Sequence, residues 1–276
     1  MTATATASVR ADARLGFGGV LRSEWIKFTS LRSTYWTSGV ILLVWIGFAL
    51  LMAGFSEFSV QGVGEDELRQ YLAVIPATIG VNVGVLVAGI LGVLAFSGEY
   101  STGMVRSSLT AVPSRLPVLA AKAVVVFVWS FLLGALSVTL SFLAAQPFFA
   151  ADGLAGAPDG PVLLAFLGAA VYLGLIALFG LGIGALVRAG AGGIAIVVGL
   201  IMVLPIVGGI LSGWIDWVTE VLAVLPSQVG MNLTGVEGNA LFGDPAYGMG
   251  ASLLILAAWS AASLLLGALA LKGRDA

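Results

Sequence analysis

The sequence predicts an all-α polytopic membrane protein with six transmembrane helices. Three observations support this prediction. Hydrophobic residues make up 59% of the chain and charged residues only 9%, whereas a soluble domain carries about a quarter charged residues. The mean hydropathy is +1.09. The sequence also contains separate apolar runs, each long enough for the roughly 20 residues that a helix needs to cross a bilayer.

The apolar runs are separated by polar or turn-forming segments, and each is expected to form one span. Residues 1–16 are expected to be a disordered cytoplasmic tail, and residues 17–276 a single transmembrane domain. No Asp, Glu, Lys or Arg lies at the middle of an expected span, which argues against ion-coupled carriers and ion pores. The expected spans cover residues 36–55, 72–96, 117–145, 161–187, 190–211 and 249–271.

The basic residues fix the expected orientation. With the N-terminus in the cytoplasm, 11 of the 12 basic residues lie inside and only Arg69 lies outside, as the positive-inside rule requires. Lys122 is near the end of a span, where its stem is expected to let the ammonium group reach water. We therefore expect a multi-pass protein of the plasma membrane with both termini in the cytoplasm.

Composition excludes several kinds of chemistry. The chain has no cysteine and no histidine, so it has no disulfide, no thiolate metal site and no histidine base. The net charge of −2 gives no reason to expect nucleic-acid binding. Lys27, Lys122 and Lys272 are the only lysines, and none lies in a Walker motif, so no ATP site is expected on this chain.

Glycines are frequent, with 38 in the chain. Gly80 and Gly84 form a pair of small residues four apart, and Gly180, Gly182 and Gly184 cluster in the fourth expected span. Small residues let membrane helices approach closely. We therefore expect these glycines to lie at helix–helix contacts.

Residues 17–35 are expected to form an amphipathic helix at the membrane surface. Leu21, Trp25, Phe28 and Leu31 recur at helical spacing, with charged residues on the other faces. Two interpretations remain open. The helix is either a basic anchor that only fixes topology or a second docking surface for a soluble partner.

The segment 98–115 is a polar interruption between two expected spans. It is expected to form a short helix at the membrane surface, with Ser101 capping its start and Pro113 limiting its end. Such a helix is available to dock onto a soluble partner. Its apolar face would be formed by Tyr100, Met104, Val105, Leu109 and Val112.

The segment 212–248 is too apolar for a free loop and too interrupted to span the membrane twice. We expect an outer element that is partly a short re-entrant or interfacial helix, followed by a loop at 235–245. Trp214 and Trp217 suit the membrane boundary.

The order of these features resembles the permease subunits of ABC-2 type transporters. The N-terminal residues 23–28, followed by Leu31, Arg32 and Ser33, resemble the family's elbow helix. The resemblance covers about residues 20–272. The first cytoplasmic loop matches the family's pattern of an acid, a glycine, P-x-R and a lysine through Glu99, Gly103, Pro113, Arg115 and Lys122.

The resemblance implies a transport subunit that is not itself an enzyme. Its partners would be a separate ATP-binding subunit that carries ATP and Mg, a second copy or a sister permease, and membrane lipid, but not nucleic acid. The implied activity is export of an amphiphilic or apolar substrate such as a drug, a peptide or a lipid-linked compound. The implied partner-binding residues are Glu99, Tyr100, Gly103, Met104, Val105, Arg106 and Leu109 in the coupling helix and Glu24, Trp25, Lys27 and Phe28 in the elbow helix.

Other functions remain as alternatives. A carrier that does not use ATP would need polar residues within spans and inverted repeats, and Asn82 is the one internal polar residue that points this way. A lipid-modifying enzyme would need clustered acids near an interface. A sensor or structural subunit would differ from a permease only in its partner and activity.

Overall fold

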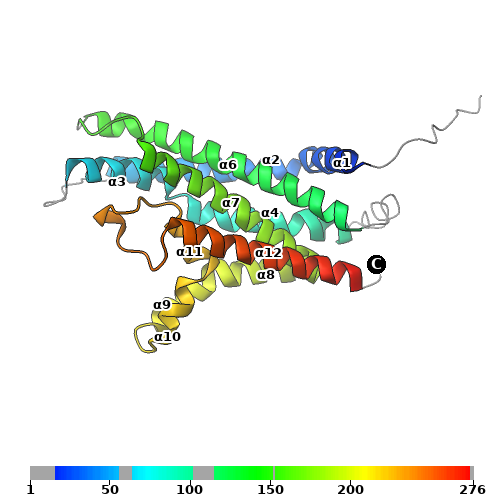
Figure 1. Ribbon diagram of the computed structural model, residues 1–276. Helices are drawn as coiled ribbons and strands as arrows, with labels where there is room; N and C mark the ends of the chain where they lie inside the picture. The colour runs from blue at the N-terminus through cyan, green and yellow to red at the C-terminus, as the bar shows by residue number, and fades with distance from the viewer. Residues whose placement is uncertain (1–15, 56–63, 102–114, 152, 274–276) are drawn as a thin grey trace, which may run out of the picture.

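The computed structural model of the chain describes residues 16–55, 64–101, 115–151 and 153–273. Within these residues the fold is all α-helical (Figure 1). The helices are α1 Phe17–Ser30, α2 Arg32–Phe55, α3 Glu65–Thr78, α4 Val81–Ser101, α6 Arg115–Ala151, α7 Gly160–Val187, α8 Gly190–Val198, the π-helix η1 Gly199–Val203, α9 Leu204–Leu211, α10 Trp217–Ala223, α11 Pro226–Asn232, the 3-10 helix η2 Ala240–Phe242 and α12 Met249–Gly273.

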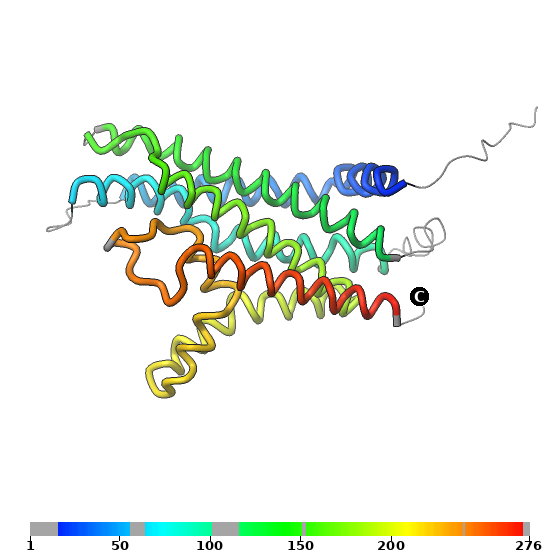
Figure 2. Tube along the Cα trace, viewed as in Figure 1, coloured from blue at the N-terminus to red at the C-terminus, as the bar shows by residue number. Residues whose placement is uncertain are grey.

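Six helical segments are long and apolar enough to cross a membrane, which confirms the expected multi-pass architecture. They run side by side in Figure 2, except that α9, the last part of segment 190–211, turns away from the others. The turns of α1 overlap in this view because its axis points across the bundle, and α1 is separated from α2 by the extended residue Leu31. The spanning segments are 32–55, 65–100, 116–150, 160–187, 190–211 and 249–272.

α7 forms the centre of the bundle, and 61% of the residues in its most apolar 18-residue stretch are buried. It contacts α4, α6 and α12. The approach to α4 is close enough that a Cβ atom at Gly92 would overlap the carbonyl oxygen of Ala177, and one at Gly180 would overlap that of Gly89. The expected role of glycine in close helix packing is therefore confirmed.

The second span is interrupted rather than continuous. α3 ends at Thr78 and α4 begins at Val81, and Pro76 lies in the last turn of α3. The buried Trp45 of α2 packs beside this break and donates a hydrogen bond from Nε1 to the carbonyl oxygen of Ala77, at 2.6 Å. A Cβ at Gly80 would lie 2.6 Å from the Trp45 Cα atom, so only glycine fits there.

The fifth span changes helix type in its middle, from α8 through the π-helix η1 to α9. Pro205 lies in the first turn of α9, where it cannot donate a hydrogen bond to the preceding turn. α9 and α10 diverge from the other helices at one end of the bundle (Figure 1). Trp214 and Trp217 lie beyond this divergence and are 88% and 62% exposed, as expected for residues at a membrane boundary.

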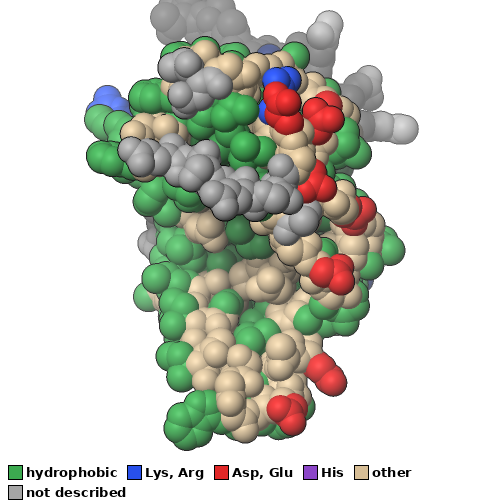
Figure 3. Space-filling view, turned by 90° about the vertical axis from the view of Figure 1, so that its left-hand side faces the viewer, with side chains coloured by type: hydrophobic (Ala, Val, Ile, Leu, Met, Phe, Trp, Pro, Cys, Tyr) green, Lys and Arg blue, Asp and Glu red, His purple; other side chains and the backbone are tan. Residues whose placement is uncertain are grey.

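The two ends of the bundle differ in charge. One end, here called the acidic end, contains the start of α3, the α6–α7 link and the loop before α12. Figure 3 shows acidic side chains spread over this end. The opposite, basic end contains α1, the end of α4, the start of α6 and the end of α12 (Figure 1). Its basic residues on described elements are Arg22, Lys27, Arg32, Arg115, Lys122, Arg188 and Lys272.

Candidate functional site

The N-terminal helix α1 presents one buried face to α6. Val20, Glu24 and Phe28 are its buried residues, and their spacing of four places them on the same side of the helix. Glu24 is only 3% exposed. Burying a carboxylate at the centre of an apolar face costs free energy unless it is paired. Glu24 is therefore expected to have charged partners on the helices that α1 contacts.

Two lysines supply those partners. Lys122 Nζ of α6 lies 2.6 Å from Glu24 Oε2 and 2.9 Å from Glu99 Oε1 of α4. Lys27 Nζ lies 2.7 Å from Glu24 Oε1 and 3.6 Å from Glu99 Oε1. These four residues, here called the ion-pair cluster, connect α1, α4 and α6. Their formal charges sum to zero.

Burial and pairing act in opposite directions on Glu24 and Lys27. Burial favours the neutral form of Glu24, but the charges and hydrogen bonds of Lys122 and Lys27 outweigh it and hold the pKa of Glu24 below its ordinary value. Burial likewise disfavours the charged form of Lys27, but Glu24 and Glu99 raise its pKa. Both groups therefore stay charged across the physiological pH range.

Aromatic packing fixes α1 and α2 against α6 next to the cluster. The Trp129 ring of α6 meets the rings of Trp25, Phe28 and Tyr35 edge to face, with centroids 5.7 to 6.2 Å apart. Its Nε1 donates a hydrogen bond to Ser38 Oγ at 3.1 Å. These contacts join the α1–α2 corner to α6.

A second contact at the basic end involves the turn between α7 and α8. Arg188 ends α7 in the left-handed conformation, with φ of 60°. Its guanidinium carbon lies 5.2 Å from the Tyr100 ring centroid, and its Nη2 donates to the carbonyl oxygen of Ala270 at 3.1 Å. The end of α4 is thereby tied to α7 and to the end of α12 through a cation–π contact and a hydrogen bond.

Two of the four expected elbow residues, Glu24 and Lys27, lie in the ion-pair cluster with Glu99. Glu24 and Phe28 are buried, Lys27 is in the ion-pair cluster and Trp25 contacts Trp129. Glu99 and Tyr100 lie in the last turn of α4, which extends five residues beyond the expected end of its span. The other expected partner-binding residues, Gly103, Met104, Val105, Arg106 and Leu109, lie outside the described residues.

Lys122 corrects one expectation. It does not extend to water from a span end, because it is only 5% exposed and bonds two carboxylates. Sequence reasoning also missed that Glu24 is the shared partner of both lysines and that Arg188 contacts Tyr100. The expectation that the charged residues of this helix lie away from its apolar stripe was wrong for Glu24, and the available signal was its spacing of three from Leu21 and four from Phe28.

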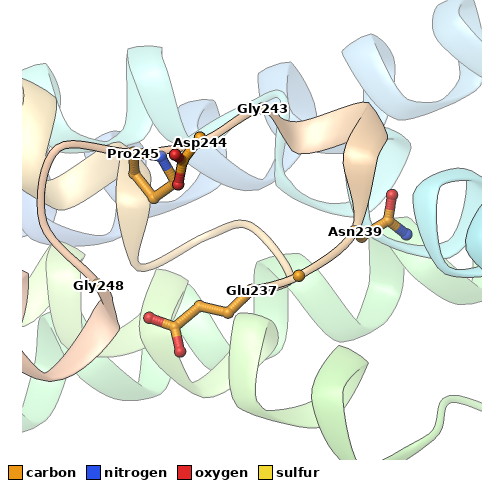
Figure 4. Close-up of a pocket in the computed structure, with 7 residues that line it drawn as sticks. Glu237, Asn239, Gly243, Asp244, Pro245 and Gly248 are labelled. Atoms are coloured by element: carbon orange, nitrogen blue, oxygen red, sulfur yellow. The ribbon is translucent and has the colours of Figure 1, made fainter.

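The acidic end holds a separate cavity of about 520 Å³ in the loop before α12 (Figure 4). Its polar groups serve the loop itself. Glu237 accepts a hydrogen bond from the amide of Met249 and caps α12. Asn239 points away from the cavity and donates to the carbonyl oxygen of Glu67 in α3, at 2.9 Å. No described group of three acidic residues is placed to hold a metal ion.

Comparison with known proteins assigns no family. No protein-family model matches the sequence, and a search of curated proteins finds no relative.

Proposed function

We propose that the chain is the membrane-spanning permease subunit of an ABC-2 type transporter. ATP would be hydrolysed on a separate subunit that docks at the basic end. The observation that supports this most is the ion-pair cluster. It joins α1 to α4 and α6, the two helices that flank the segment expected to contact the ATPase.

A lever must be rigid to transmit motion, and the described contacts provide rigidity on both sides of segment 102–114. α4 ends just before the segment, and its last turn is held by the ion pair of Glu99 and by the contact of Tyr100 with Arg188. α6 begins just after the segment, and its second turn contains Lys122, whose ammonium group bonds both Glu24 and Glu99. Displacement of the segment would therefore move α1, α4 and α6 together rather than bend one helix.

The proposed transport mechanism follows from this connection. ATP binding would close two ATPase subunits, and the basic end would carry the motion into the bundle of a permease dimer. ATP and Mg would be bound by the partner and not by this chain. The substrate would be amphiphilic or apolar, because the described spans are dominated by apolar side chains and glycines. Export is the proposed direction, from the family resemblance.

Coupled ATP hydrolysis tests this proposal. Leu109→Asp introduces a charge on the face expected to contact the ATPase, where an unpaired charge would be desolvated. We expect insertion to be normal but permease-dependent ATP hydrolysis to fall at least about tenfold, equivalent to ~1.4 kcal/mol of coupling. Thr110→Asp, on the opposite face of the expected helix, is the matched control. Equal activity in wild type and Leu109→Asp would contradict the docking assignment.

An ATP-independent carrier or a membrane sensor remains the alternative. Asn82, the residue that pointed toward a carrier, is exposed on the surface of α4 and donates to the carbonyl oxygen of Ile79 in the preceding turn. Its position therefore does not favour the alternative over the permease.

A further inference from the structure

A cavity of about 490 Å³ lies beside the ion-pair cluster, between the α1–α2 corner, α4 and α6. This volume is within the range of small-molecule sites, which run from about 300 to 1,000 Å³. Ile90, Leu91 and Leu94 of α4 form an apolar wall. Leu31 and Leu94 are about half exposed, so the cavity opens to the surroundings of the bundle. The proposed coupling mechanism assigns this cavity no role.

One edge of the cavity carries charges of both signs. Lys27 and Glu99 line it, and Lys27 Nζ lies 3.6 Å from Glu99 Oε1. Glu24 and Lys122 also line the cavity and complete two opposite pairs. A cluster of zero net charge gives little attraction for a singly charged head group. The cluster is complementary to a zwitterion, whose ammonium group can approach the carboxylates while its anionic group approaches the lysines.

Hydroxyl groups on the α1–α2 corner add directionality. Ser30, Thr34 and Thr37 line the cavity, and each hydroxyl donates to a backbone carbonyl oxygen, at 2.8, 3.0 and 2.6 Å. Because each hydroxyl proton is already engaged, each of these oxygens can act toward a ligand only as an acceptor. Such a wall favours a head group that donates N–H bonds, as a primary ammonium does and a quaternary ammonium does not.

We propose that this cavity binds a zwitterionic phospholipid whose head group carries a primary ammonium. The head group lies against the ion-pair cluster and the three hydroxyls, and hydrocarbon extends along the apolar wall of α4. The position suits a lipid, since the charged edge lies where α1 meets the basic ends of α4 and α6, and the apolar wall follows the span formed by α4. A bound lipid would stabilise the corner that fixes α1.

Native mass spectrometry of the purified chain tests the proposal without any ATPase. The protein is titrated with phosphatidylethanolamine, phosphatidylcholine and phosphatidylglycerol of identical acyl chains. We expect phosphatidylethanolamine to be retained roughly tenfold better than phosphatidylcholine, the ratio for loss of one hydrogen bond to a charged group. Equal retention of the three lipids, or preference for the anionic one, overturns the proposal.

Two variants of Thr37 locate the site, and a third variant serves as the control. Thr37→Trp fills the cavity and should abolish selective retention, whereas the control Leu43→Trp, on the exposed surface of α2, should not. Thr37→Val keeps the side-chain volume, removes one acceptor and should reduce the preference for phosphatidylethanolamine roughly threefold. This variant decides the outcome if Thr37→Trp misfolds. Unchanged preference in Thr37→Val and in a folded Thr37→Trp would place the lipid elsewhere.

Discussion

Lys122 is the residue on which the basic end depends most. Its ammonium group bonds carboxylates from two other helices, Glu24 and Glu99, at 2.6 and 2.9 Å. A buried ion pair adds little net stability compared with apolar packing, but removal of one partner leaves an uncompensated buried charge. The main value of the cluster is therefore that it defines one arrangement of α1, α4 and α6.

We predict that Lys122→Met destabilises the purified protein by about 3–5 kcal/mol, because Glu24 loses its closest partner. The effect is measured as a lowered thermal midpoint in detergent. Lys272→Met, at an exposed site, is the control and should change little. The double variant Glu24→Gln/Lys122→Met should recover part of the loss, since Lys27 and Glu99 remain as a balanced pair. A midpoint equal to wild type in Lys122→Met would show that the cluster does not form.

The residue scale is also where sequence reasoning was weakest. The family resemblance named Glu24, Lys27 and Glu99 as partner-binding residues, and the structure places all three in the ion-pair cluster. Sequence reasoning did not pair them, because Lys122 and Glu24 are 98 residues apart and no local periodicity connects them. Burial of Lys122 depends on two carboxylates brought by other helices, which a hydropathy pattern cannot reveal.

At the scale of elements, the close contact of α4 with α7 determines how the bundle packs. Gly89, Gly92, Gly180 and Gly184 allow backbone to approach backbone along this contact. Membrane helices gain little from the hydrophobic effect within lipid, so close van der Waals packing carries much of their association.

We predict that Gly180→Ala destabilises the bundle by about 1–3 kcal/mol, because its Cβ would overlap the Gly89 backbone and push α4 from α7. Gly47→Ala in α2 is the matched control, since a Cβ there meets nothing within 4 Å. Thermal midpoints of both variants in the same detergent give the comparison. Equal midpoints would mean that the two helices are further apart than described.

Element positions were largely predictable, but element irregularities were not. Runs of about 20 apolar residues gave all six spans, because crossing a bilayer imposes this length on any sequence. The break between α3 and α4 was missed because it depends on Trp45 from another helix, packed against Gly80. The π-helix at 199–203 lies in an apolar run without a local signal that separates it from α-helix.

At the scale of the whole molecule, charge divides the bundle into a basic end and an acidic end, of which Figure 3 shows the acidic one. The positive-inside rule predicts that the basic end faces the cytoplasm. A partner that hydrolyses cytoplasmic ATP would have to meet this end, so the orientation is a necessary condition for the proposed function.

We predict that a membrane-impermeant maleimide labels Asp244→Cys in intact cells but labels Lys272→Cys only after the membrane is opened. The chain has no native cysteine, so each variant carries a single reactive thiol. Both positions lie at the surface, at the acidic and basic ends respectively. Labelling in the opposite order would place the basic end outside and exclude docking of a cytoplasmic ATPase there.

The most direct test of the permease assignment is recovery of its partner. Tagged chain is purified from native membranes in mild detergent, and the co-purified proteins are identified by mass spectrometry. We predict recovery of an ATPase with a Walker lysine, its loss with Met104→Asp and its retention with Thr110→Asp. Absence of any such ATPase, under conditions that keep known transporter complexes intact, would contradict the assignment.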